Sequence, residues 1–317
     1  MKLHRLGRTD LHIPPLVFGG NVFGWTADKA TSFALLDRLA EAGLNTIDTA
    51  DIYSHWAPGN QGGESETIIG EWMQSRARRG STIVITKVGG PGGRKRGLTA
   101  QSIAQDCEAS LKRLRIETID LYLSHFPDAD TPYQETLAAF DKLKQAGKIR
   151  WFGASNLDAA QLVASLDAAR SASLPRYEVL QPEYNLYDRA GFEGPLRDLC
   201  IAHDIGIITY FSLAKGFLSG KYRDEADLKQ SPRGGGVKAY LNPRGFRLLA
   251  ALDRVAAAHR AKPAEVALAW VAQRPGVTAP IASATSLAQL ESLINAATLS
   301  LKAEEMAALE SAGADWV

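Results

Sequence analysis

The chain alternates between short apolar runs and longer segments in which apolar residues recur every three or four positions. Runs of about four to eight residues have the length of buried strands, and the recurring spacing is typical of amphipathic helices. Strands are expected at 16–19, 46–48, 83–87, 119–124, 150–155, 179–183, 205–209 and 278–281. Helices are expected at 28–42, 64–73, 99–114, 132–146, 159–172, 194–203, 246–259, 263–273 and 287–295, with Gly43 ending the first and Thr99 capping the third.

Strands that alternate with helices form parallel sheets, and eight such units at this length favour a closed barrel. We therefore predict an α/β protein, a (β/α)8 TIM barrel with an N-terminal β-hairpin and an extra C-terminal helix. Segments 2–6 and 11–14, around a polar turn at 7–10, indicate the hairpin. A doubly wound sheet is the alternative, but the sequence GGNVFG at 19–24 does not match the GxGxxG fingerprint.

The pattern shows no linker, so residues 1–317 are expected to form a single domain. The longest irregular stretch, 223–244, has the length of a functional loop.

With 36 basic and 35 acidic residues the formal charge is +1, which argues against a nucleic-acid partner. No apolar run approaches the roughly 18 residues of a membrane helix. The two cysteines are far from any CxxC pattern, and a reducing cytoplasm is expected; the six histidines show no metal-binding spacing, so no metal is expected.

Polar and ionisable residues stand where the predicted strands end. Asp48 ends the second strand with Tyr53 in the loop that follows, Lys87 ends the third, and His125 follows the fourth. Taken alone, Asp48 and Tyr53 would fit a capping carboxylate and a packed aromatic ring. In a barrel of this kind, however, the C-terminal strand ends share one rim, where active sites are built.

These four side chains suit proton donation to an oxygen that gains negative charge. A tyrosine with a pKa near 10 is a poor acid at neutral pH, and a neighbouring lysine ammonium lowers that pKa. Asp48 supplies the counter-charge for Lys87, and His125 can hydrogen-bond a substrate oxygen. Side chains do not supply hydride, which a nicotinamide cofactor would.

The sequence resembles the aldo-keto reductases over nearly its whole length. The matching segments are DTADIY at 48–53, GESE at 63–66, ITK at 85–87, LSH at 123–125 with PD at 127–128, GASN at 153–156 and QPEYN at 181–185. The resemblance implies that Tyr53 is the general acid/base, tuned by Lys87 and Asp48, and that His125 orients the substrate oxygen. It also implies metal-free, NADPH-dependent reduction of aldehydes and ketones.

The resemblance further implies a set of cofactor-binding residues. Ser155, Asn156 and Gln181 would hold the nicotinamide carboxamide, and Tyr210 would stack on its ring. The cofactor phosphates would lie along the loop after the seventh strand, where Lys215 and Lys221 have suitable charge. The expected contacts in this loop and after the eighth strand are Ser212, Leu213, Lys215, Gly216, Lys221, Ser283, Thr285 and Gln289. Relatives more often have Ser-Pro where Phe211-Ser212 stands.

The adenosine end departs from the family pattern, which has Glu-Asn near the adenine where this chain has Ser292-Leu293. No Lys or Arg lies between Pro280 and Asn295 to bind a 2′-phosphate. Two alternatives follow. Either Arg233, Lys238 or Arg244 from the long insertion reaches over, or discrimination for NADP is weak and NADH can serve.

A small-molecule carbonyl or alcohol substrate is expected, and Trp25, His55 and Trp56 are candidates for its binding wall. The basic, glycine-rich segment 89–97 lacks P-loop spacing, and we interpret it as a solvated rim loop. Two other functions stay open: a cofactor-binding regulatory module resembling the β subunits of potassium channels, and an NAD-preferring alcohol or sugar dehydrogenase. The sequence gives no prediction of oligomeric state.

Overall fold

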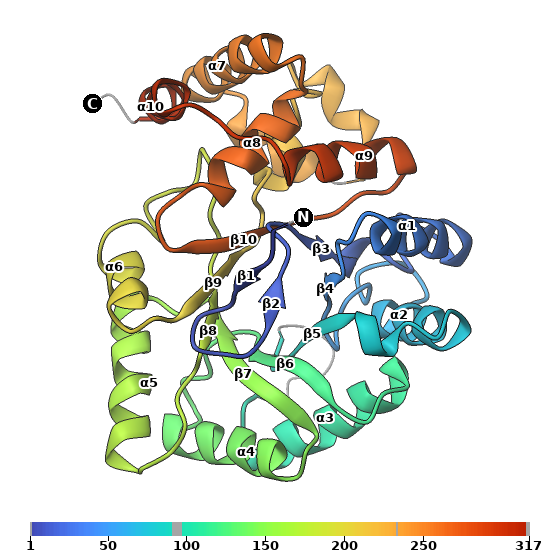
Figure 1. Ribbon diagram of the computed structural model, residues 1–317, viewed down its shortest axis with the longest axis vertical. Helices are drawn as coiled ribbons and strands as arrows, with labels where there is room; N and C mark the ends of the chain where they lie inside the picture. Colours follow the sequence, from blue (N-terminus) through green and yellow to red (C-terminus); the bar gives the residue numbers. More distant parts are fainter. Residues whose placement is uncertain (1, 91–96, 233, 315–317) are drawn as a thin grey trace.

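The computed structural model describes residues 2–90, 97–232 and 234–314 (Figure 1). Most of the predicted rim loop 89–97, Arg233 and the last three residues lie outside the described residues. The arrangement of the described part is the predicted (β/α)8 TIM barrel with an N-terminal hairpin.

Eight parallel strands form a closed barrel in which each pairs with its neighbour in the chain and the last pairs with the first. The strands are β3 (Val17–Gly19), β4 (Thr46–Asp48), β5 (Ile83–Val88), β6 (Ile119–Ser124), β7 (Ile149–Ser155), β8 (Val179–Gln181), β9 (Gly206–Thr209) and β10 (Val277–Ala282). The register pairs Gly19 with Asp48, Val88 with Ser124 and Ser155 with Gln181, which are the last residues of their strands, so these strands end at a common rim.

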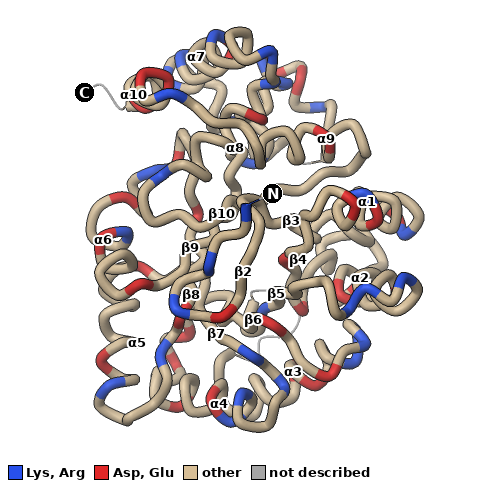
Figure 2. Tube along the Cα trace, viewed as in Figure 1, with Lys and Arg blue, Asp and Glu red and all other residues tan. Residues whose placement is uncertain are grey.

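Helices surround the barrel, and α7, α8, α9 and α10 gather on one side of it, above β10 in the view of Figure 1. The helices are α1 (Lys29–Glu41), α2 (Glu64–Ser75), α3 (Ala100–Leu114), α4 (Tyr133–Gln145), α5 (Ala159–Ser171), α6 (Pro195–Ala202), α7 (Pro243–His259), α8 (Pro263–Ala272), α9 (Leu287–Ala296) and α10 (Ala303–Ala312). The predicted cap of α3 is confirmed, because the Thr99 hydroxyl accepts from the backbone of Ser102. Acidic and basic residues are spread over these helices without a large patch of one sign in this view (Figure 2).

The hairpin of β1 (His4–Arg5) and β2 (His12–Ile13) closes one end of the barrel. Leu6, Leu11 and Ile13 are buried against the inward side chains of the barrel strands. Gly7 lies so close to the start of β9 that an added Cβ would be 2.4 Å from the nitrogen of Gly206. The hairpin therefore covers the N-terminal strand ends and leaves the C-terminal ends for a binding site.

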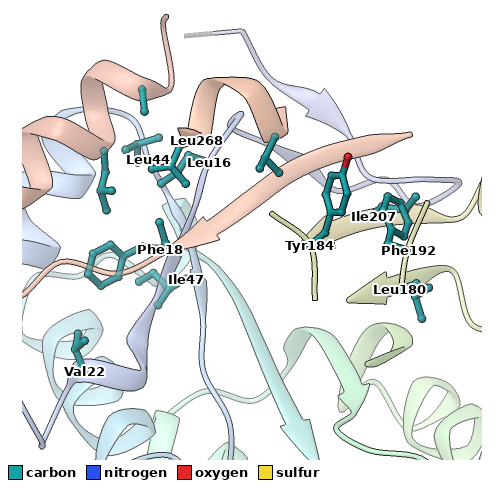
Figure 3. Close-up of a cluster of buried hydrophobic side chains, with 14 of the residues drawn as sticks. Leu16, Phe18, Val22, Leu44, Ile47, Leu180, Tyr184, Phe192, Ile207 and Leu268 are labelled. Carbon is teal, nitrogen blue, oxygen red and sulfur yellow. The ribbon is translucent and has the colours of Figure 1, made fainter. Parts of the chain in front are cut away.

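Side chains alternate between the barrel interior and the layer under the helices. On β5, Val84 and Val88 pack outward into the larger apolar cluster, whereas Ile85 belongs to the inner one. Figure 3 shows part of the outer layer, including Phe18 and Ile47. This alternation decides which polar side chains reach the interior.

The insertion at 223–244 contains more regular structure than predicted. Short 3-10 helices occupy Ala226–Gln230 and Gly234–Tyr240, after another at Ala214–Ser219; two more lie at Gly20–Val22 and Arg79–Ser81. Helix α7 begins at Pro243, earlier than the predicted 246, because the Asn242 side chain accepts from the backbone of Gly245.

Candidate active site

Strand alternation turns two charged side chains into the barrel. Asp48 ends β4, and Lys87 lies two residues after the inward Ile85 on β5. Because side chains two apart share a face, Lys87 also points inward. The side chain of Asp48 is 3% exposed and that of Lys87 is 0% exposed. Neither charge is solvated, so each needs a protein partner.

The ammonium group of Lys87 has three oxygen partners. Nζ donates to Oδ1 of Asp48 at 2.7 Å, to the carbonyl of Thr49 at 2.8 Å and to the hydroxyl of Tyr53 at 2.8 Å. An ammonium group has three hydrogens, and these contacts occupy them all. Because a positive group donates to the phenol oxygen, the arrangement favours the phenolate and makes the Tyr53 proton easier to release.

Burial decides the charge states around Tyr53. It lowers the pKa of Lys87 from its usual value, while the carboxylate of Asp48 opposes that change. Burial also lowers the pKa of His125 well below its usual value, and the nearby charge of Lys87 lowers it further. His125 is therefore a neutral imidazole at neutral pH, with its ring centroid 5.9 Å from that of Tyr53. Its buried Nδ1 has no hydrogen-bond partner among the described residues.

Asp48 is held through both carboxylate oxygens. Gln181, the last residue of β8, donates from Nε2 to Oδ2 of Asp48 at 2.8 Å, opposite the contact with Lys87. The hydroxyl of Ser155, at the end of β7, donates to the carbonyl of Gln181 at 2.8 Å. The predicted amide-binding residues are thus connected to the charged pair, which fixes the orientation of the carboxylate.

Asn156 connects two neighbouring parts of the rim. Its φ of +61° lies in the left-handed region, which asparagine tolerates better than most residues. Nδ2 donates to the carbonyl of His125 at 2.8 Å, and Oδ1 accepts from the hydroxyl of Tyr210 at 2.6 Å. The ring of Tyr210 is therefore fixed relative to the end of β6.

A cavity of about 980 Å³ opens over these residues. It is large even for a small-molecule site, which suits an extended ligand. Among the predicted residues it is lined by Asp48, Tyr53, His125, Ser155, Asn156, Gln181, Tyr210, Ser212, Leu213, Lys215, Gly216, Lys221, Ser283, Thr285 and Gln289. Lys87 is not exposed to it, since Nζ is fully buried beside the ring of Tyr53.

The loop after β9 carries two lysines to the cavity. Lys215 and Gly216 have left-handed backbones, with φ of +57° and +103°. The second value favours glycine, and an added Cβ there would meet nothing closer than 3.7 Å, so the loop is open at this point. Lys215 and Lys221 lie over the rings of Phe211 and Tyr222.

The other end of the cavity is formed by the segment that enters α9. Ser283 donates from its hydroxyl to Oδ1 of Asn21 at 2.7 Å. The backbone and hydroxyl of Thr285 both donate to Oε1 of Gln289, at 2.9 and 3.1 Å. These predicted residues lie just before and within the first turn of a helix, where backbone N–H groups favour anions.

Lys238 and Arg244, the two predicted candidates of the insertion that the structure describes, do not line the cavity. Lys238 lies 3.3 Å from a carboxylate oxygen of Glu225, and Arg244 donates to the carbonyls of Gly313 and Tyr187 at 2.8 Å each. Neither lines the cavity, and Arg233 is outside the described residues.

The structure instead brings Lys262 to this end, a residue that sequence reasoning missed. Lys262 precedes α8, and its Nζ donates to the hydroxyl of Ser292 on α9 at 3.0 Å. Both residues line the cavity. The only sequence signal was a lysine before a helix-starting proline, because the contact between α8 and α9 is a tertiary feature.

Aromatic rings form the wall beside Tyr53. Trp25 and Trp56 line the cavity, with ring centroids 5.6 Å apart, and the ring centroid of Trp56 is 5.9 Å from that of Tyr53. The structure does not bring His55 to the wall: its ring packs on Trp56, and Nδ1 lies 2.9 Å from the carbonyl of Ile52. Sequence reasoning missed Phe126 and Phe211, which line the cavity directly after His125 and Tyr210.

A second polar cluster lies behind β5. Glu66 accepts from the hydroxyl of Thr86 at 2.6 Å and from Nε of Arg113 at 2.6 Å. Burial raises the pKa of Asp51 to about 7, and the charges of Glu66 and Asp106 raise it while Arg113 lowers it. This cluster lies outside the cavity lining.

Within the described residues no group of three or more His, Cys, Asp or Glu side chains could hold a metal ion. In the same residues no helix is both long and apolar enough to cross a membrane.

Comparison with known proteins identifies the family. The model of the Aldo/keto reductase family matches residues 15–314. The chain belongs to this family. It is 33% identical over 316 residues to the uncharacterized oxidoreductase YrpG of Bacillus subtilis. This match covers 96% of this chain and 93% of that protein. It is 32% identical over 302 residues to a probable voltage-gated potassium channel subunit beta of Arabidopsis thaliana, over 92% of this chain and 89% of that protein. It is 28% identical to the aldo-keto reductase AMT2 of Alternaria alternata, and this match covers 96% of this chain and 90% of that protein.

Aldo/keto reductases generally use nicotinamide cofactors, and the cavity of this aldo/keto reductase fits one chemically. The charged groups lining it among the described residues are one carboxylate, Asp48, and the three lysines Lys215, Lys221 and Lys262. A lysine-rich cavity with serine, threonine and amide groups suits a ligand that carries several phosphates.

Proposed function

We propose that this chain is a nicotinamide-dependent oxidoreductase that reduces aldehyde or ketone carbonyls to alcohols, or catalyses the reverse reaction. The observation that carries the proposal is the contact of Lys87 Nζ with both Tyr53 Oη and Asp48 Oδ1 at the base of the large cavity. A phenol beside a buried ammonium group is a proton donor suited to an oxygen that becomes negative. Membership of the aldo/keto reductase family supports the same chemistry.

The proton side of the reaction is assigned to four residues. Tyr53 donates its proton to the substrate oxygen as that oxygen gains charge, and Lys87 stabilises the phenolate that remains. Asp48 keeps Lys87 charged in a buried position. His125, as a neutral imidazole, donates a hydrogen bond to the same substrate oxygen and orients it. In the reverse direction the phenolate of Tyr53 accepts the alcohol proton.

The dinucleotide would be held along the cavity, and its nicotinamide, when bound, supplies the hydride that side chains lack. Ser155, Asn156 and Gln181 are proposed to bind the carboxamide, and Tyr210 to support the ring. Their support is their place beside Asp48 and His125. Ser212, Leu213, Lys215, Gly216 and Lys221 are proposed for the pyrophosphate, and Ser283, Thr285 and Gln289 for the adenosine end.

The substrate would enter past the aromatic side of the cavity. Trp25, Trp56, Phe126 and Phe211 all contribute aromatic rings to the cavity lining, and Nζ of Lys215 lies over the ring of Phe211. Trp25 and Trp56 pack together beside Tyr53, and aromatic rings favour flat substrates, so aromatic aldehydes are the first compounds to assay.

The test is Tyr53→Phe, which removes one hydroxyl and leaves the ring. We expect kcat/KM for carbonyl reduction to fall by about 10²- to 10⁴-fold, the usual contribution of a general acid. Binding of NADPH, followed by fluorescence titration, should stay within about threefold of the wild type, because the hydroxyl is not among the proposed cofactor contacts. Unchanged carbonyl reduction in the variant would disprove the assignment of Tyr53.

A second function is favoured by one of the relatives, which is named as a probable potassium channel subunit beta. A regulatory module could keep the same four residues and the same cavity, so the residues do not separate the two functions. Turnover separates the two functions, because steady reduction of simple aldehydes over multiple cycles per chain supports an enzyme. Tight dinucleotide binding without turnover across a panel of carbonyls and alcohols, with both cofactors, would favour the module.

A further inference from the structure

We propose that Lys262 recognises the 2′-phosphate of NADPH and thereby gives this chain its preference for the phosphorylated dinucleotide. The inference rests on the proposed function, because it concerns the same cavity and the same cofactor. It assigns the contact to the residue that precedes α8, in a chain whose segment 280–295 contains no Lys or Arg.

The first support is position. Lys262, Thr285, Gln289 and Ser292 line the cavity from the starts of α8 and α9 and from α9 itself, whereas Tyr53 and His125 line it from the segments that follow β4 and β6. If the nicotinamide lies against Tyr53, the adenosine lies at the end beside α9. A 2′-phosphate is a dianion near neutral pH, and a cation beside it is the main feature that separates it from a ribose hydroxyl.

The second support is the placement of the other basic candidates that the structure describes. Lys238 and Arg244 are engaged with Glu225 and with backbone carbonyls, away from the cavity. Lys215 and Lys221 belong to the loop after β9, whereas Lys262 contacts α9 itself. Lys262 is therefore the described cation best placed for the adenosine end.

The third support is that the ammonium group of Lys262 is available. Glu265 accepts from the backbone nitrogen of Lys262 at 3.3 Å, and its other oxygen accepts from Asn295 at 3.4 Å. The ammonium group itself donates to the neutral hydroxyl of Ser292, and no carboxylate of the described residues pairs with it. A phosphate can accept from Nζ and from the Ser292 hydroxyl without displacing a carboxylate.

The chain contains a matched control in Lys302. Lys302 precedes α10 as Lys262 precedes α8, and its backbone nitrogen likewise donates to a glutamate three residues on, Glu305. Lys302 does not line the cavity. Replacing either lysine changes the same kind of helix start, but only the replacement of Lys262 should lower the affinity for NADPH.

The experiment measures Kd for NADPH and NADH by fluorescence titration of the full chain and of Lys262→Met, Lys262→Arg and Lys302→Met. A charge-assisted hydrogen bond predicts a loss of about 10- to 100-fold in NADPH affinity for Lys262→Met. NADH affinity should change by less than about threefold, Lys262→Arg should retain most of the preference, and Lys302→Met should match the wild type. Thermal shifts with 2′,5′-ADP and 5′-ADP give a readout independent of catalysis, and only the shift with 2′,5′-ADP should shrink in Lys262→Met.

Three results would overturn the inference. They are equal loss of both dinucleotides in Lys262→Met, no change in either, and a wild-type chain that binds NADPH and NADH equally. Each of these leaves dinucleotide binding and carbonyl reduction in place. Failure of the proposed function differs, because the wild type would then bind neither dinucleotide or reduce no carbonyl.

Discussion

The buried pair of Asp48 and Lys87 should behave as one unit in stability measurements. Asp48→Asn and Lys87→Met each remove one charge with little change in size. Either change leaves the other charge without its partner. That charge stays buried, because the side chain of Asp48 is 3% exposed and that of Lys87 is 0% exposed. The double variant removes both charges and leaves no uncompensated one.

The structure sets the magnitude. Unit charges 2.7 Å apart attract by about 6 kcal/mol at an effective dielectric constant of about 20. Part of this is retained in the single variants, because Lys87 keeps Thr49 and Tyr53 as partners and Asp48 keeps Gln181. We therefore expect each single change to lower the free energy of unfolding by about 3–5 kcal/mol, the usual result of breaking a buried pair.

The double variant should be at least about 2 kcal/mol more stable than the sum of the single effects predicts, since neither charge remains. Urea unfolding at pH 7, analysed as a double-mutant cycle, measures this coupling. All three variants should lose carbonyl reduction, because the ammonium group no longer supports Tyr53 or is no longer held charged. Additive single effects, with a coupling below about 0.5 kcal/mol, would refute the view that the two charges stabilise each other.

Two further predictions concern the surroundings of this pair. In Asp51→Asn the stability of the fold should depend less on pH. The pKa of Asp51 is raised to about 7, so the folded chain holds this proton between about pH 4 and 7 and loses stability as pH rises through that window. The variant should be more stable than the wild type above pH 7, by about 1–3 kcal/mol in thermal or urea unfolding, and an unchanged or steeper pH dependence would contradict this. In Trp56→Ala, KM for an aromatic aldehyde should rise about tenfold while KM for a two-carbon aldehyde changes little, as expected for a lost aromatic wall. Equal changes for both substrates would show that Trp56 does not contact the substrate.

The fold and the group around Tyr53 were predictable from sequence because both depend on local periodicity. Alternating faces on β4, β5 and β8 decide that Asp48, Lys87 and Gln181 point inward, and parallel strands bring their ends to one rim. The start of α7 was also encoded locally: Asn242 followed by Pro243 is a helix-start signal that the periodicity alone did not reveal.

The remaining parts depended on loop geometry and on contacts between distant elements. His55 and Trp56 are adjacent in sequence, yet only Trp56 lines the cavity, while the ring of His55 packs on Trp56 and contacts the carbonyl of Ile52. Lys262 is 30 residues from Ser292, and only the packing of α8 against α9 brings them together. Sequence patterns carry no direct information on either feature.

This division has a consequence for how the cavity can change. The residues proposed for proton transfer stand on or beside barrel strands, and hydrogen bonds tie Asp48 to both Lys87 and Gln181. The residues proposed for the adenosine end stand at helix starts, and Lys262 meets that end through a single hydroxyl contact. A substitution at Lys262 therefore has few partners to disturb, whereas one at Asp48 disturbs a buried charge network. Cofactor preference can accordingly shift while the pH dependence of the chemistry is retained, and the pH–rate profile of Lys262→Met should match the wild type at saturating NADH.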